Sequence, residues 1–202
     1  MNASKNNLLL IAVGSLGLTA IAVSFIYRKQ LTSTISNVKN TISDVVDYAF
    51  SKDVEEGMKE LHPKAQPIFR AFLRDVEKMG YKVKLTSGYR TFQEQIGLKK
   101  QNSSNATAGF SHHNYGTSLD INVLKGNNWL RKSSSKSDWK KSGIPQMAKS
   151  KYDLRWGADF KGYHDPIHFD LENIYPVNKL YAQAIKQFGS AEKAQGNKVN
   201  IT

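Results

Sequence analysis

The stretch Ser111-His112-His113-Asn114-Tyr115-Gly116-Thr117-Ser118-Leu119-Asp120 places histidine and aspartate side chains seven positions apart, from His113 to Asp120. A second cluster, Asp165-Pro166-Ile167-His168-Phe169-Asp170, adds another histidine with an acid three residues before it. Imidazole nitrogens and carboxylate oxygens are common zinc ligands. Because the chain has no cysteine, any metal must be held by His, Asp or Glu. The two clusters therefore indicate a zinc hydrolase.

The clusters together supply one catalytic ligand set. His113, Asp120 and His168 give two histidines and one carboxylate, and a catalytic zinc site keeps its fourth position for water. Activated water also needs a base, and Asp165 lies on the segment that enters the His168 strand. These residues predict hydrolysis of a carbonyl derivative, in which the metal and a cation stabilise the developing oxyanion.

The hydrophobic pattern around the clusters predicts an α+β domain with a small antiparallel sheet and flanking helices that hold one zinc site. In the predicted strand 119–124, Asp120 and Asn122 share one face. The Lys/Ser/Asn-rich segment 125–141 predicts a mobile surface loop, either a basic flap beside the substrate or a solvated insertion. Further strands are predicted at 81–87 and 168–171, and helices at 54–61, 68–80, 92–100, 144–150 and 177–188.

The N-terminal region predicts a membrane-spanning helix and a helical stalk before the domain. Residues 8–27 are apolar and uncharged, about the length that crosses a bilayer. A cleaved signal peptide, with Ala20-Ile21-Ala22 as its cleavage site, is the alternative. After it, apolar residues recur at steps of four and three from Leu31 to Ala49. This seam indicates either a stalk that self-associates or an amphipathic helix on a surface.

These patterns predict four segments. They are a membrane anchor or signal peptide at 1–29, a helical stalk at 30–52, a zinc hydrolase domain at 53–188 and a flexible tail at 189–202.

The charge balance favours a polyanionic partner. Lys and Arg number 29 against 17 Asp and Glu, a formal net charge of +12. Nucleic acid, anionic lipid and anionic wall polymers all have the required sign. The chain carries no nucleic-acid recognition motif with clustered basic and aromatic residues, so we expect no nucleic-acid partner.

Four motifs in this order resemble one known family. They are Ser111-x-His113-x-x-Gly116-x-Ser118-x-Asp120, the upstream Ser87-Gly88-Tyr89-Arg90-Thr91, the pair Trp156-Gly157, and Asp165-x-x-His168-Phe169. The chain is similar here to the zinc D-alanyl-D-alanine carboxypeptidases and L-alanyl-D-glutamate endopeptidases, which cut the peptide stems of bacterial peptidoglycan. The resemblance covers roughly residues 61–170, about half of the chain. The family more often has Ala where Ser118 stands.

The resemblance implies a role for each matching residue. His113, Asp120 and His168 would bind Zn²⁺, and Asp165 would be the catalytic base. Arg90 would hold the scissile carbonyl or a substrate carboxylate, a role that its guanidinium fork suits. Ser111 would line the substrate side. His112 and His164, which neighbour motif residues, are expected to be neither ligands nor catalytic groups.

An aspartate as the base is similar to the phage-type L-alanyl-D-glutamate endopeptidases, so that bond is favoured, with D-alanyl-D-alanine carboxypeptidase action as the other possibility. The expected partners are peptidoglycan stem peptides, a membrane through the N-terminal helix, and anionic wall polymers. The catalytic domain would face the cell wall from a bacterial envelope or a phage or virion membrane, or be exported after signal cleavage. A catalytically silent zinc-containing module that binds wall or protein is the alternative function.

Overall fold

The computed structural model describes residues 50–201. The predicted anchor at 1–29 and nearly all of the predicted stalk at 30–52 lie outside the described residues. Within residues 50–201, no helix is both long enough and apolar enough to cross a membrane. The helices of this part are α2 (Lys52–Glu60), α3 (Gln66–Lys78), α4 (Phe92–Gln101), α5 (Lys136–Lys141), α6 (Ile144–Tyr152) and α7 (Val177–Phe188), with 3₁₀ turns η1 (His112–Tyr115), η2 (Gly157–Asp159) and η3 (Gly196–Lys198).

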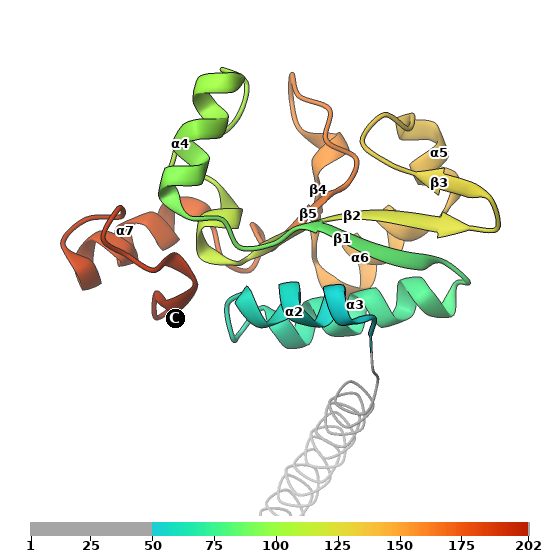
Figure 1. Ribbon diagram of the computed structural model, residues 1–202, viewed down its shortest axis with the longest axis horizontal. Helices are drawn as coiled ribbons and strands as arrows, with labels where there is room; N and C mark the ends of the chain where they lie inside the picture. Colours follow the sequence, from blue (N-terminus) through green and yellow to red (C-terminus); the bar gives the residue numbers. More distant parts are fainter. Residues whose placement is uncertain (1–49, 202) are drawn as a thin grey trace, which may run out of the picture. The chain divides into compact units, whose positions relative to one another are not determined.

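One antiparallel sheet runs through the centre of the domain. Its strands follow the order β1-β2-β5-β4, and β3 pairs with β2 beside this path. Helices α2 and α3 lie along one face, while α4 and the loop between β4 and β5 rise on the other (Figure 1). The predicted α+β class with a small antiparallel sheet is confirmed. The strands are β1 (Lys82–Ser87), β2 (Ser118–Lys125), β3 (Asn128–Leu130), β4 (Arg155–Trp156) and β5 (His168–Asp170).

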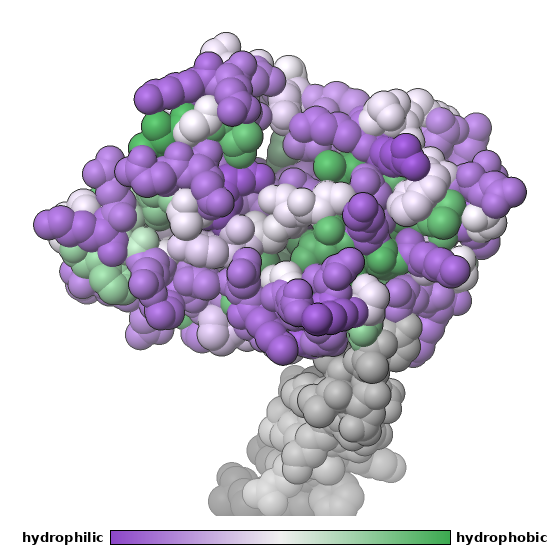
Figure 2. Space-filling view, in the orientation of Figure 1, coloured by the Kyte–Doolittle hydropathy of each residue, from purple (hydrophilic) through white to green (hydrophobic). Residues whose placement is uncertain are grey.

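Strand β2 separates the core from the functional face. Its residues Leu119, Ile121 and Val123 are fully buried, and they alternate with the less buried Asp120 and Asn122. This period of two arises because successive side chains of a strand point to opposite faces. The apolar face packs against α3, whose Phe69, Phe72 and Leu73 are also fully buried. The face of the domain drawn in Figure 2 is largely hydrophilic, and hydrophobic side chains show mainly in its recesses.

The segment 125–141 is more ordered than the sequence predicts. It contains β3 and α5, and Trp139 from α5 is fully buried in the main core. The Trp139 indole nitrogen donates a hydrogen bond to the Arg131 carbonyl. The Lys- and Ser-rich composition concealed one large apolar anchor, so the prediction of a mobile loop was wrong for this part of the segment.

The segment after α7 also differs from the predicted flexible tail. Ala191, Ala194, Val199 and Ile201 are buried in a second apolar cluster together with Tyr115. The His62 imidazole donates from Nε2 to the Val199 carbonyl at 2.9 Å. Small apolar residues spaced along a polar segment give a weak sequence signal, yet they attach residues 189–201 to the domain.

At the other end, the core extends beyond the predicted start at Asp53. Phe50 is 8% exposed and belongs to the main apolar cluster, with Val54 and Met58 of α2. The Ser51 carbonyl accepts a hydrogen bond from the Glu55 amide, which continues the first turn of α2. Residues 50–201 belong to one compact unit.

Candidate metal centre

Strand register places two of the predicted ligands side by side. Asp120 of β2 is the direct antiparallel partner of His168 of β5. Directly opposed residues on one face of an antiparallel pair have Cβ atoms about 4.5–5.5 Å apart. The apolar alternation of β2 that buries Leu119 and Ile121 therefore also turns Asp120 toward His168.

The third predicted ligand comes from the turn η1, which is fixed by close backbone packing. Gly116 ends the turn with φ of +63°, and a Cβ there would lie 2.5 Å from the His62 amide nitrogen. Only glycine fits both the positive φ and this contact. The Arg90 amide donates to the His113 carbonyl at 3.0 Å. The seven-residue spacing from His113 to Asp120 thus reflects one tight turn that leads directly into β2.

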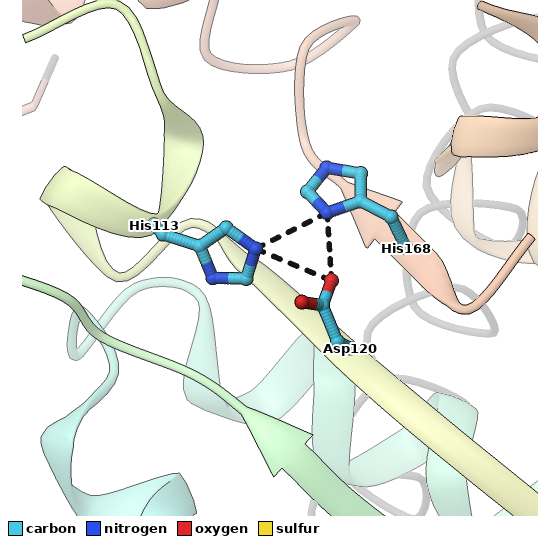
Figure 3. A group of neighbouring side chains, drawn as sticks. All are labelled: His113, Asp120 and His168. Carbon is cyan, nitrogen blue, oxygen red and sulfur yellow. Dashed lines mark hydrogen bonds and ion pairs between the residues drawn. The ribbon is translucent and has the colours of Figure 1, made fainter. Parts of the chain in front are cut away.

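The three side chains converge on one point (Figure 3). His113 Nε2 lies 3.2 Å from His168 Nδ1 and 3.2 Å from Asp120 Oδ1, and His168 Nδ1 lies 2.9 Å from Asp120 Oδ1. Tetrahedral zinc with bonds of about 2.0–2.2 Å holds its donors roughly 3.4 Å apart. The donor set and its spacing therefore fit a zinc ion after an outward shift of a few tenths of an ångström.

Both imidazoles are oriented by hydrogen bonds from their other nitrogen. His113 Nδ1 donates to the Gly88 carbonyl at 2.6 Å, and His168 Nε2 donates to Asp170 Oδ2 at 2.9 Å. Metal-bound histidines characteristically make such outer contacts, which fix the ring tautomer. The other ring nitrogens, His113 Nε2 and His168 Nδ1, are the two that face Asp120.

The electrostatics of the cluster favour a carboxylate anion. Burial alone would raise the pKa of Asp120, but the His113 and His168 rings hold it well below its ordinary range. Asp120 therefore offers an ionised oxygen, the form that binds a metal.

Asp165 lies at the edge of the cluster with one oxygen lacking a partner. Its Oδ1 is buried and has no hydrogen-bond partner among the described residues, while Oδ2 lies 3.5 Å from Lys132 Nζ. Burial and the nearby Asp120 carboxylate raise the pKa of Asp165. A Cβ on Gly157 would lie 2.4 Å from the Asp165 carbonyl and 2.8 Å from the His168 Cβ. The Trp156-Gly157 motif thus provides the space that lets the Asp165 loop close onto β5.

Arg90 and Ser111 line the same cleft as the cluster. The Arg90 guanidinium donates to Gln95 Oε1 at 2.8 Å and to Ser87 Oγ at 2.9 Å. Both acceptors are neutral, so these contacts orient the cation without neutralising it. Ser111, 8% exposed, immediately precedes the turn η1. The structure thus brings all six predicted site residues to one cleft of about 290 Å³.

His112 and His164 take no part in the three-residue cluster, as expected from the sequence. His112 donates from Nε2 to Glu172 at 2.5 Å, and its Nδ1 contacts Thr117 Oγ1 at 2.8 Å. His164 is exposed, and its Nε2 lies 3.4 Å from the Ser134 carbonyl oxygen. The two neighbours of the motif residues thus hold loops in place.

Three groups of the site were missed in the sequence. Asp170 holds His168, Arg155 pairs with Asp170 through Nη2 at 2.7 Å, and Lys132 reaches Asp165. Asp170 follows His168 at the strand spacing of two, which is a usable signal for a same-face partner. Arg155 lies at the site because β4 pairs with β5, and Lys132 because the connection between β3 and α5 passes the cleft. No local sequence pattern therefore identifies either residue.

An α+β domain with a two-histidine, one-carboxylate cluster defines a candidate metallohydrolase, and comparison with known proteins narrows this class. The family model described as D-alanyl-D-alanine carboxypeptidase matches residues 104–171, the span that contains the cluster and Asp165. The peptidoglycan L-alanyl-D-glutamate endopeptidase CwlK of Bacillus subtilis is 29% identical over 126 residues, which cover 55% of this chain and 74% of that protein.

Among solved structures, the L-Ala D-Glu endopeptidase ChiX of Serratia marcescens has a TM-score of 0.48 and 21% identity, covering 67% of this chain and 98% of that one. The family match and the CwlK similarity support the resemblance to the D-alanyl-D-alanine carboxypeptidases and L-alanyl-D-glutamate endopeptidases, and the chain is a peptidase.

Proposed function

We propose that this protein is a zinc-dependent peptidase that hydrolyses peptidoglycan stem peptides at the L-alanyl-D-glutamate bond, in cell-wall lysis or remodelling. The observation that carries the proposal is the convergence of His113, Asp120 and His168 beside the orphaned oxygen of Asp165. The similarity to CwlK supports the choice of bond, since that relative is an L-alanyl-D-glutamate endopeptidase. D-alanyl-D-alanine carboxypeptidase action, named by the family model, is the second candidate.

Each residue of the site has a separate role in the proposed reaction. Zn²⁺, held by His113, Asp120 and His168, supplies Lewis-acid activation of water and of the scissile carbonyl. Asp165 accepts the proton of the attacking water on Oδ1 and delivers it to the leaving amine nitrogen. A raised pKa suits this double role, because the ideal catalytic pKa lies near the operating pH. Arg90 donates from its guanidinium to the carbonyl oxygen, on which negative charge develops.

The open cleft and Asp165 argue against a catalytically silent zinc module. A structural zinc site usually fills all four positions with protein groups. Within the described part of the chain, the cluster contains three such residues.

Replacing Asp165 with Asn tests the function and the assignment of the base. We expect muropeptide release from purified wall to fall by about 10²–10⁴-fold, with zinc content unchanged because Asp165 is outside the ligand set. Asp159→Asn, an exposed aspartate paired with Lys136, is the matched control. Mass spectrometry of the released peptides identifies the bond. Undiminished cleavage by Asp165→Asn would contradict the assignment of Asp165 as the catalytic base.

We also propose that residues 8–27 tether the protein to a membrane, with the catalytic domain facing the cell wall in a bacterial envelope or a phage or virion membrane. The apolar, uncharged composition of this span supports the proposal, and the net charge of +12 suits binding to anionic wall polymers. Self-association through the seam at 31–49 belongs to the same proposal. Fractionation tests it: the full chain should sediment with membranes, whereas recovery in the soluble fraction without detergent would favour signal cleavage.

A further inference from the structure

Lys132 places an ammonium group at the border of the catalytic cleft. It comes from the connection between β3 and α5, and it lines the cleft together with Asp165 and Tyr163. Its Nζ lies 3.2 Å from the Tyr163 hydroxyl and 3.5 Å from Asp165 Oδ2. The ammonium is therefore close to the base and still open to solvent, with 55% of the side chain exposed.

The contacts of Lys132 leave donor capacity for another partner. An ammonium has three N–H donors. One is directed at the Tyr163 hydroxyl, and the separation from Asp165 exceeds the usual 2.7–2.9 Å of a charge-assisted hydrogen bond. The Tyr163 hydroxyl itself donates to Asn105 Oδ1 at 3.3 Å. Lys132 is thus held in position by a neutral group and only loosely paired with an acid.

The charge balance of the cleft favours an anionic ligand. Its lining has three cations, Arg90, Lys132 and Arg155, and three carboxylates, Asp120, Asp165 and Asp170. Asp170 is already paired with Arg155. A bound divalent cation would give the lining an excess positive charge of two.

We propose that Lys132 binds a free carboxylate on the substrate residue that adjoins the scissile bond. The inference rests on the proposed function and extends it to the substrate. Because Asp165 must lie beside the attacked carbonyl, a group held by its neighbour Lys132 lies within about one residue of that carbonyl. In an L-alanyl-D-glutamyl bond linked onward through the γ-carboxyl, the glutamate α-carboxylate is such a group. Lys132 is then a specificity-determining residue that selects acidic over amidated stems.

The test measures the effect of one substitution on two substrates, using the full chain in detergent. Lys132→Met is assayed with two synthetic stem peptides that differ only in whether the glutamate α-carboxylate is free or amidated. Loss of a charge-assisted contact should lower kcat/KM for the free acid by about 10–100-fold. For the amide the loss should stay within about threefold, since no charge is there to be bound.

Lys141→Met, an exposed lysine on α5 that pairs only loosely with Asp138, is the matched control. An equal loss of kcat/KM on the two peptides would overturn the proposal, because Lys132 would then act through Asp165 and not through the substrate carboxylate. No loss on either peptide would overturn it as well. A second measurement does not depend on turnover. Calorimetry compares the affinities of the wild-type protein and Lys132→Met for the product peptides that carry the free α-carboxylate or its amide. A wild-type protein that cleaves neither peptide but prefers the acid product through Lys132 would reject the proposed function and retain this inference. Equal product affinities would reject the inference.

Discussion

His168 donates a hydrogen bond from Nε2 to the buried carboxylate of Asp170 at 2.9 Å, and this contact leaves Nδ1 facing the metal cluster. The acceptor therefore selects the tautomer that can bind a metal. Asp170 is held in turn by Arg155, whose Nε and Nη2 donate to both of its oxygens. The orientation of His168 in the candidate metal cluster therefore depends on a carboxylate that is not a member of that cluster.

We predict that Asp170→Asn lowers zinc affinity by about 10–100-fold, because outer partners of metal-bound histidines contribute on this scale. An amide can turn its NH₂ toward His168 and remove the constraint on the tautomer. Competition with a chromogenic chelator measures the change in Kd. Asp159→Asn, on the exposed surface, should leave the Kd unaltered. An unchanged Kd in Asp170→Asn would show that the strand alone positions His168.

Zinc binding should release about one proton near neutral pH. Burial alone would lower the pKa of His168, but hydrogen bonds to Asp120 and Asp170 raise it above its ordinary value in the metal-free protein. His168 is then protonated before the metal binds and must lose that proton from Nδ1. Because binding releases this proton, the apparent Kd for zinc should fall as pH rises through neutrality. Calorimetry in buffers of different ionisation enthalpy counts the protons, and a heat independent of buffer would contradict the prediction.

The sequence allowed the metal cluster to be predicted because its members lie on short local patterns. Each ligand lies in one short pattern: His113 in a tight turn, Asp120 in an alternating strand, and His168 in the segment 165–170. Lys132 and Arg155 could not be predicted in this way, because chain segments without a motif carry them to the cleft. The packed segment after Gly189 was missed for another physical reason: its buried apolar residues are few and widely spaced, and two of the four are alanines, whose small apolar area gives little periodic signal.

Glu55 and Arg70 make a partly buried bidentate ion pair, with separations of 2.7 and 2.8 Å. The hydrogen bond from Arg70 lowers the pKa of Glu55, so the folded state favours the ionised carboxylate. Its stabilisation is complete above the unfolded pKa of about 4.3 and disappears as pH falls through the folded value. Glu55→Gln should therefore cost about 1 kcal/mol of unfolding free energy at neutral pH and almost nothing near pH 2. Urea unfolding at the two pH values measures this, with the exposed Glu56→Gln as the control. A pH-independent cost would assign the effect to packing.

Gly196 packs directly on the turn that carries His113. A Cβ at Gly196 would lie 1.7 Å from the Asn114 carbonyl oxygen, so Gly196→Ala must displace residues 189–201 or the turn itself. We expect a loss of about 1–3 kcal/mol in unfolding free energy, typical of overpacking. Gly97→Ala, in α4 with open space around it, should instead stabilise the protein by up to about 1 kcal/mol through helix propensity. Equal melting temperatures for Gly196→Ala and wild type would show that the C-terminal segment does not press on the turn.

The burial of Phe50 determines where the catalytic domain can be cut from the N-terminal region. A deletion through Lys52, at the predicted end of the stalk, removes Phe50 from the main core together with the residue whose carbonyl begins α2. Loss of a buried phenylalanine side chain costs about 3–5 kcal/mol. A chain that begins at Tyr48 should therefore melt well above one that begins at Asp53, by roughly 6–10 °C or more for a domain of this size. Thermal unfolding of the two chains under one set of conditions makes the comparison. Equal melting temperatures would mean that the first turn of α2 is dispensable and that the domain begins where the sequence pattern places it.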